Sequence, residues 1–171
     1  MTIGKLEHTP VGTIWATASD DGLVGISLWD EPDSLLVDLA RHTGEMPNLN
    51  SPPGPIVRLA LDELDAYLRG ELREFKCPIE WAILKPFQRV VLEQVAAVPY
   101  GHTTSYGAIA ERIGRPGAVR AVGQANATNP IPIIIPCHRI LGADGKLHGY
   151  GARGGLETKA WLLRLEGSWL I

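Results

Sequence analysis

Cysteine is scarce in this chain of 171 residues, which contains only Cys77 and Cys137. Neither belongs to a Cys-x-x-Cys pair. The sequence therefore excludes a zinc site built on paired cysteines, and it excludes the disulfide framework of a small secreted domain. Both thiols suit a reducing compartment, and we expect no metal.

Long apolar runs are also missing. No stretch approaches the roughly 20 apolar residues that span a bilayer. The N-terminus lacks a basic region followed by an apolar one, which a secretory signal peptide requires. We therefore expect a cytoplasmic protein with no membrane partner. Hydrophobic residues still make up 45% of the chain, enough for the core of one ordinary domain or two small ones.

The net charge is small, −3 in total, but it is unevenly distributed. Residues 1–84 carry six Lys and Arg against 14 Asp and Glu, whereas residues 85–171 carry ten against five. This change of sign predicts two domains, 1–84 and 85–171. A basic half suits an anionic partner, and nucleic acid is the commonest such partner, although an excess of five positive charges is modest.

The first domain is expected to be an α+β scaffold. The Asp20-Asp21-Gly22 turn lies between two strand-forming runs and predicts a hairpin. Leucines at helical spacing predict two helices. The expected elements are strands at 6–9, 13–18, 23–29 and 77–81, and helices near 35–40 and 56–68. No ligand cluster or nucleophile pair occurs in this half.

The second domain is expected to be mainly helical. Apolar spacing after Pro86 predicts a helix that stops at 99–101. Two short helices follow, at 104–114 and 118–128, and a tight turn containing Gly117 joins them. Two short helices connected in this way predict a helix-turn-helix.

The second of these short helices, 118–128, consists largely of alanine and glycine. Small residues allow another structure to come close to the backbone. This favours either packing against a neighbouring helix or a shallow contact with nucleic acid, in which Arg120 is the one long basic side chain.

Residues 129–139 read Asn-Pro-Ile-Pro-Ile-Ile-Ile-Pro-Cys-His-Arg and carry the most reactive groups. Prolines and isoleucines predict a stiff, extended and buried segment. Burial raises the pKa of a thiol and makes it inert, whereas an adjacent imidazole lowers the pKa and activates it. Cys137 is therefore either a small buried hydrophobe or a nucleophile, and the Pro-Cys-His-Arg string favours the nucleophile.

Cys137 and His138 are adjacent, and adjacent side chains of an extended segment point to opposite sides. Either the chain turns at Pro136 and Cys137, or a water molecule joins the two side chains. A general base also needs a group that orients its second nitrogen. Glu166, at the end of a helix expected over 156–166, is our candidate. The buried face of that helix is expected to contain Leu156, Ala160 and Leu163.

With these motifs in order, the sequence resembles the O6-alkylguanine-DNA alkyltransferases, which repair DNA by direct reversal. The resemblance covers the whole C-terminal half, and the N-terminal half is only loosely similar. The matching motifs are Ser105-Tyr106-Gly107, residues 118–123, the lead-in at 129–133, Pro136-Cys137-His138-Arg139, and Trp161-Leu162-Leu163 with Glu166-Gly167.

The resemblance implies an α+β N-terminal domain with a small antiparallel sheet and a helical C-terminal domain that binds DNA. It implies entry of the second short helix into the minor groove, with Arg120 replacing a flipped-out base. The partner would be double-stranded DNA containing O6-alkylguanine. Cys137 would accept one alkyl group and react only once, because a thioether is a poor leaving group. The protein would need no cofactor and would act as a monomer.

The resemblance also implies a role for each site residue. Cys137 attacks the alkyl carbon, His138 takes the thiol proton through water, and Glu166 orients His138. Asn129 braces the turn, and the Tyr106 hydroxyl gives a proton to the departing base. The implied DNA contacts are Ser105, Tyr106, Arg120, Ala121 and Gly123, and the implied base pocket is lined by Pro132, Tyr150 and Gly151.

The chain departs from the family pattern in a longer loop at 146–155 and in Leu92, where relatives often carry tryptophan. Three other functions stay open: a non-catalytic alkylguanine-DNA-binding protein, a DNA-binding regulator, and a cysteine hydrolase. The presence of Cys137 argues against the first. The adjacency of Cys137 and His138, without an evident oxyanion feature, argues against the hydrolase. Activity on O4-alkylthymine is also left open.

Overall fold

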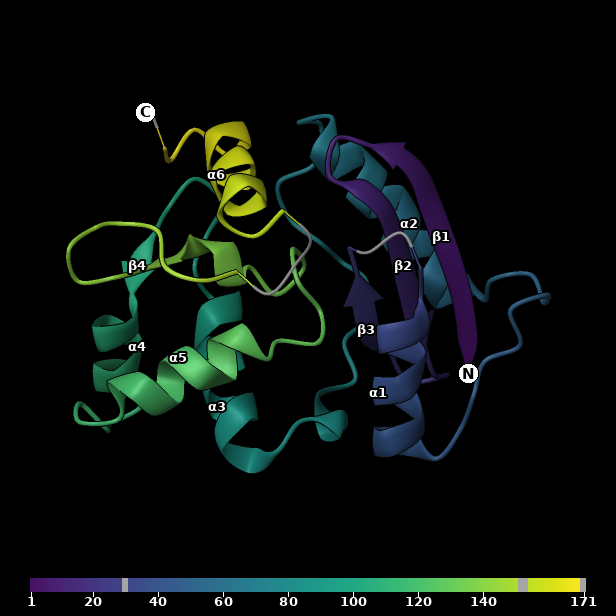
Figure 1. The fold of residues 1–171 in the computed structure, drawn as a ribbon, viewed down its shortest axis with the longest axis horizontal. Helices are drawn as coiled ribbons and strands as arrows, with labels where there is room; N and C mark the ends of the chain where they lie inside the picture. Colours follow the sequence, from purple (N-terminus) through teal and green to yellow (C-terminus); the bar gives the residue numbers. More distant parts are fainter. Residues whose placement is uncertain (29–30, 151–153, 170–171) are drawn as a thin grey trace. The chain divides into compact units, whose positions relative to one another are not determined.

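The structure is a computed structural model that describes residues 1–28, 31–150 and 154–169. The chain forms two compact units, Met1–Ile83 and Leu84–Ile171 (Figure 1). The first unit contains a small antiparallel sheet with two helices, and the second is mainly helical. The expected α+β fold class is therefore confirmed.

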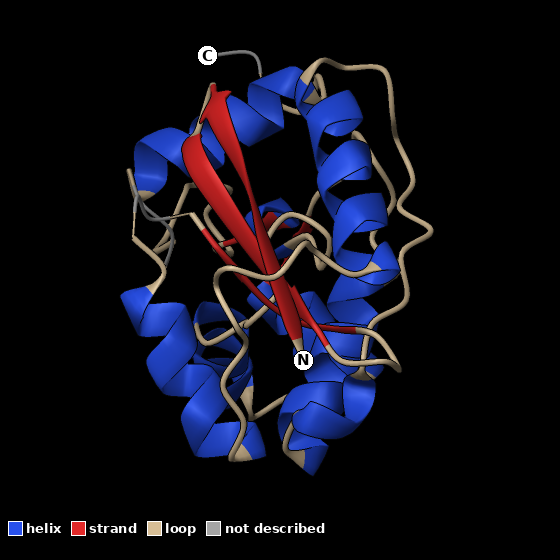
Figure 2. Ribbon diagram, turned by 90° about the vertical axis from the view of Figure 1, so that its right-hand side faces the viewer, coloured by secondary structure: helices blue, strands red, loops and turns tan. Residues whose placement is uncertain are grey.

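The sheet of the first unit has three strands in the order β1 (Thr2–Thr9), β2 (Gly12–Ala18) and β3 (Leu23–Ser27). Two antiparallel hairpins place neighbouring strands side by side (Figures 1 and 2). The predicted turn at 20–22 closes with a hydrogen bond of 3.0 Å from Ser19 N to Gly22 O. Trp29, at the end of the predicted third strand, lies outside the described residues.

Two helices complete the first unit. Helix α1 (Asp33–Thr43) packs against β3, and α2 (Pro55–Leu68) packs along β1 and β2. Pro55 stands in the first turn of α2, where its missing N–H has no helical partner to lose. The strand predicted at 77–81 is reduced to one bridge, because Ile79 pairs with Leu23 and a 3₁₀ turn at Trp81–Ile83 follows directly.

Cys77 belongs to this unit and is buried. Its backbone N–H donates to Glu63 Oε2 at 3.1 Å. Burial, together with the Glu63 carboxylate, raises the pKa of the Cys77 thiol to about 12. The thiol is therefore protonated at neutral pH and unreactive.

The second unit contains the helices α3 (Pro86–Ala96), α4 (Tyr106–Arg112), α5 (Val119–Ala127) and α6 (Leu156–Leu165). Helix α3 packs against both α4 and α5. Leu92 on α3 is fully buried and fills the core of this unit. None of the helices within the described residues is both long enough and apolar enough to cross a membrane.

Helices α4 and α5 form the predicted pair of short helices. Ser105 begins α4, since its Oγ accepts a hydrogen bond of 3.1 Å from Ala108 N. Gly114, with φ of +72°, ends the segment, and Ala118 N donates to Arg115 O at 2.9 Å within the connecting turn. The two helices pack against each other, as a helix-turn-helix requires.

A short parallel strand pair links the start of α4 to the segment after Cys137. Strand β4 (Thr104–Ser105) pairs with β5 (Ile140–Leu141), with Thr104 opposite Ile140. Because Tyr106 follows β4 directly, this pairing sets its distance from the cysteine turn.

Most of residues 129–139 are buried as predicted, with Asn129, Pro130 and Pro132 half-buried, but the prediction of an extended segment is wrong. Ile133 has φ of +73°, a value that β-branched residues rarely adopt, and Ile135 N donates to Ile131 O at 3.0 Å. The side chain of Asn129 makes this loop favourable. Its Oδ1 accepts from Ile131 N at 3.0 Å, and its Nδ2 donates to Ile135 O at 2.9 Å.

The predicted buried face of α6 is partly wrong. Ala160 and Leu163 are buried, but Leu156 is 45% exposed. Thr158 and Lys159 point inward instead. Because Leu156 is the first residue of the helix, it lies outside the part of the stripe that reaches the core.

Candidate active site

Cys137 begins a 3₁₀ turn, η2 (Cys137–Arg139), which also contains His138 and Arg139. The chain therefore turns at Pro136 and Cys137, which was one of the two alternatives. Pro136 has ψ of 62°, and Arg139 N donates to Pro136 O at 2.9 Å. All three residues of the turn are buried. The turn holds a thiol, an imidazole and a guanidinium together away from bulk water.

Glu166 follows α6 directly, is buried, and contacts two residues of this turn. His138 Nε2 lies 2.8 Å from Glu166 Oε1. Arg139 donates to both carboxylate oxygens through Nε and Nη2, at 2.8 to 3.2 Å. A carboxylate bound by a guanidinium accepts hydrogen bonds, so Nε2 of His138 carries the hydrogen and Nδ1 keeps its lone pair. Glu166 thus selects the tautomer in which Nδ1 is the basic nitrogen.

Arg139 has a structural part in the site that the sequence did not assign. Its Nη1 donates to the Val98 carbonyl at 2.6 Å, and its guanidinium lies 5.8 Å from the centre of the Tyr100 ring. With Glu166, these contacts satisfy a buried cation on several sides. The sequence position of Arg139, directly after His138, could have predicted this part. A buried carboxylate that orients a histidine also needs a counter-charge.

The thiol and the imidazole are both neutral in the resting site. Burial raises the pKa of the Cys137 thiol, against the opposing effects of Asn129, Lys159 and the local backbone N–H groups. Burial also lowers the pKa of His138, although Glu166 acts in the other direction. The site therefore does not hold a thiolate and an imidazolium at neutral pH, and a proton must move before the sulfur attacks.

Lys159 on α6 was missed by the sequence reasoning. It is fully buried, and its Nζ donates to Ile140 O at 2.7 Å and to His148 O at 2.9 Å. Burial lowers the pKa of Lys159 to about 8, so the side chain still carries charge at neutral pH. That charge lowers the pKa of the Cys137 thiol. Lysines are rarely fully buried, so helical periodicity gave no reason to expect it inside.

Two tyrosines lie at the same site. The Tyr106 hydroxyl donates to His148 O at 3.3 Å, and Lys159 Nζ lies 6.0 Å from the centre of its ring. The hydroxyl of Tyr150 is buried and has no hydrogen-bond partner among the described residues. Burial, then the negative charge that Cys137 carries once ionised and the charge of Glu166, raise the pKa of Tyr150 well above its usual value. Tyr150 therefore presents a neutral hydroxyl near the reacting groups.

The other predicted residues lie on more accessible parts of the unit. Arg120 and Ala121 are exposed on α5, and Gly123 and Pro132 are half-buried. Gly151 lies outside the described residues. Cys137, His138 and Glu166 thus form a buried group around η2, and Arg120 and Ala121 are exposed on α5. Half-buried positions are Ser105, Tyr106, Asn129, Pro132 and Gly123.

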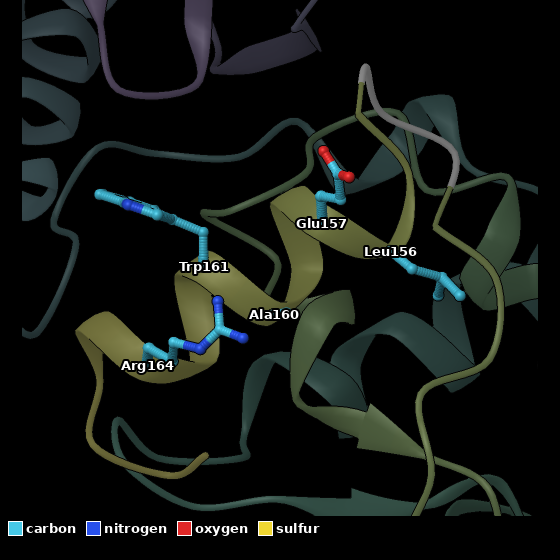
Figure 3. Close-up of a pocket in the computed structure, with 5 residues that line it drawn as sticks. All are labelled: Leu156, Glu157, Ala160, Trp161 and Arg164. Atoms are coloured by element: carbon cyan, nitrogen blue, oxygen red, sulfur yellow. The ribbon is translucent and has the colours of Figure 1, made fainter. Parts of the chain in front are cut away.

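A shallow groove runs along α6, and its lining side chains project from that single helix (Figure 3). Its lining consists of Leu156, Glu157, Ala160, Trp161 and Arg164. It contains none of the predicted site residues. Within the part of the chain that the structure describes, no three His, Cys, Asp or Glu side chains gather in a way that could hold a metal ion.

Two family models match the chain. The model described as "6-O-methylguanine DNA methyltransferase, DNA binding domain" matches residues 86–168, and the one described as its ribonuclease-like domain matches residues 4–81. A methylated-DNA–protein-cysteine methyltransferase of Salmonella typhimurium is 38% identical over 168 residues, covering 95% of this chain and 94% of the relative.

A second relative, the methylated-DNA–protein-cysteine methyltransferase of Mycobacterium leprae, is 53% identical over 107 residues. That match covers 63% of this chain and 63% of the relative, which is less than two thirds of its length.

Solved structures resemble the whole chain. Mycobacterium tuberculosis O6-methylguanine methyltransferase has a TM-score of 0.77 at 39% identity, covering 99% of this chain and 94% of that chain. Mycobacterium tuberculosis OGT in complex with DNA has a TM-score of 0.78 at 38% identity, covering 98% and 94%.

Proposed function

Because the chain belongs to the 6-O-methylguanine DNA methyltransferase family, we propose that it repairs DNA by moving an alkyl group from guanine O6 to Cys137. The observation that carries this proposal is the buried turn at Cys137–Arg139. It places a thiol beside a histidine whose tautomer is selected by Glu166. A non-catalytic binding protein would not need this arrangement.

The proposed reaction is one displacement at carbon. The Cys137 proton passes through a water molecule to Nδ1 of His138, the S–C bond forms, and the C–O6 bond breaks. The departing guanine takes a proton from the Tyr106 hydroxyl, so charge does not build up on the base. The product sulfur is a thioether, which cannot leave again. Each molecule therefore reacts once, as a stoichiometric reagent.

DNA binding is proposed for α5. Its accessible side carries Arg120 and Ala121 with few bulky side chains, which suits close approach to a groove. The target atom is inside the base stack, so the nucleotide must rotate out of the duplex, and Arg120 would fill the vacated space. The partner is double-stranded DNA containing O6-alkylguanine, bound by one cytoplasmic monomer without a cofactor. The first unit, Met1–Ile83, would serve as a scaffold.

Incubation with duplex DNA containing O6-methylguanine should add the mass of one methylene group to the intact protein. Peptide mapping should locate the methyl group on Cys137. Cys77 serves as an internal control, because its thiol has a pKa of about 12 and should stay unmodified. No mass change in folded protein would exclude transfer and favour a binding function. Release of many product equivalents per protein would indicate a hydrolase.

Replacing Arg120 with alanine should slow repair in duplex DNA by about tenfold. An inserted side chain offsets unstacking, which costs a few kcal/mol per base step. Reaction with free O6-methylguanine base should not change, since no duplex is opened. Arg89→Ala is the matched control, because Arg89 is an exposed arginine of the same unit on α3. Equal losses on both substrates would exclude a flipping role for Arg120.

A further inference from the structure

A buried asparagine on α5 lies between two groups of the proposed reaction. Asn126 is 6% exposed, although its helix otherwise buries only Val122 and Ala125. Its Nδ2 donates to the backbone carbonyl of Cys137 at 3.3 Å. Its side chain also lies close enough to the Tyr106 hydroxyl group to counteract the rise in the pKa of that hydroxyl that burial causes. One amide therefore lies between the nucleophile's backbone and the proposed proton donor.

Packing places α5 against Tyr106 at two positions on one helix face. A methyl group added at Gly123 would lie 4.0 Å from Cδ1 of Tyr106, so the ring sits close to the backbone at Gly123. Asn126 is three residues further along and therefore on the same face. The glycine allows the Tyr106 ring to come close, and the Asn126 amide lies on the same side of the helix.

The orientation of the Asn126 amide follows from the neighbouring groups. Tyr106 donates its hydrogen to His148 O, so its oxygen presents lone pairs to Asn126. The carbonyl of Cys137 can only accept. Both neighbours thus require the NH₂ end of Asn126. Turning the amide over would place its oxygen against two acceptors, so its orientation is fixed.

We propose that Asn126 is a positioning residue for alkyl transfer, which acts by holding the Tyr106 hydroxyl in place and stabilising it as it gives up its proton. This inference rests on the proposed function. As Tyr106 protonates the departing guanine, negative charge develops on its oxygen. An N–H of Asn126 that reaches this oxygen then forms a hydrogen bond to a charged group, which is roughly twice as strong as a neutral one. The carbonyl of His148 keeps its hydrogen bond from Lys159 when the Tyr106 hydroxyl turns to the base.

A double-mutant cycle tests the inference, with the rate of methyl transfer from O6-methylguanine in duplex DNA as the measurement. Asn126→Leu keeps the shape of the side chain and removes both N–H groups. It should slow transfer about tenfold in the wild-type background, the size of one hydrogen bond to a charged group. In a Tyr106→Phe background the same change should slow transfer less than about twofold, because there is no hydroxyl to hold.

A second measurement isolates the contact with Cys137. Any effect of Asn126→Leu on the rate at which iodoacetamide alkylates Cys137 should be the same in the wild-type and Tyr106→Phe backgrounds, since that reaction does not involve Tyr106. If the leucine variant does not fold, Asn126→Ala gives the same cycle without an apolar group beside the Cys137 carbonyl. Equal slowing in both backgrounds would overturn the inference, as would a normal rate for Tyr106→Phe alone. Failure of the wild-type protein to accept a methyl group would overturn the proposed function instead.

Discussion

Glu166→Gln should slow methyl transfer by roughly a hundredfold or more, within the range attributed to general acid–base catalysis. The carboxylate accepts from Nε2 of His138 at 2.8 Å and thereby keeps Nδ1 basic. A glutamine amide can present either its oxygen or its NH₂ group, so it does not select one tautomer. Single-turnover rates of methyl transfer, measured against pH, should show the loss across the neutral range.

The same change should lower the free energy of unfolding by about 3–5 kcal/mol. Arg139 and Glu166 form an ion pair with side chains 7% and 0% exposed, and glutamine leaves the guanidinium without its counter-charge. Glu93→Gln is the matched control. Its pair with Arg89 has the same 2.8 Å separation but side chains 48% and 42% exposed, and such a pair contributes about 0–1 kcal/mol.

The double variant Glu166→Gln with Arg139→Met separates stability from chemistry. Removing both charges should restore much of the unfolding free energy, because neither buried position then carries an uncompensated charge. Methyl transfer should stay slow, since no carboxylate orients His138. Recovery of the transfer rate would show that Glu166 serves only to neutralise Arg139.

Lys159→Met should slow alkylation of Cys137 by iodoacetamide at neutral pH by about tenfold to a hundredfold. An opposite charge close to an ionisable group shifts its pKa by about 1–3 units. The positive charge of Lys159 lowers the pKa of the Cys137 thiol, so its removal raises that pKa and moves the rate–pH curve to higher pH. Methyl transfer should fall in parallel.

Lys159→Met should slow the alkylation of Cys137 at every pH, but the size of the decrease should depend on pH. Lys159 has a pKa of about 8, so below that value it is protonated and wild type should exceed the variant most clearly. Above it the cation is lost and the two proteins should converge. Lys146→Met is the control, because Lys146 is exposed on the loop before Tyr150. A curve that keeps its position in Lys159→Met would limit this lysine to supporting the backbone of Ile140 and His148.

The sequence predicted most of the architecture because its strongest signals are local. The turn at 20–22 and the pair of short helices joined through Gly117 each depend on residues a few positions away, and both are found where expected. Residues 129–139 show the limit of this reasoning. Their composition predicts an extended strand, but the side chain of Asn129 bonds across the loop and stabilises a fold-back that β propensity does not describe.

Site residues that are adjacent in the chain could be predicted from the sequence. Site residues that only the fold brings to the cysteine turn were harder to predict. Cys137 and His138 stand next to each other, and Glu166 lies at the expected edge of α6. Lys159 and Asn126 are polar residues on helices, and such residues are ordinarily exposed. Their burial depends on the close packing of α6 and α5 around the cysteine turn. The periodicity of the sequence does not predict this packing.

The inertness of Cys77 gives this chain a practical property. A thiol with a pKa of about 12 does not compete for electrophiles at neutral pH, and the chain has only one other cysteine. Each folded molecule therefore offers a single labelling position. The amount of alkylating reagent consumed therefore equals the amount of protein that can react at Cys137, and Cys77 need not be replaced.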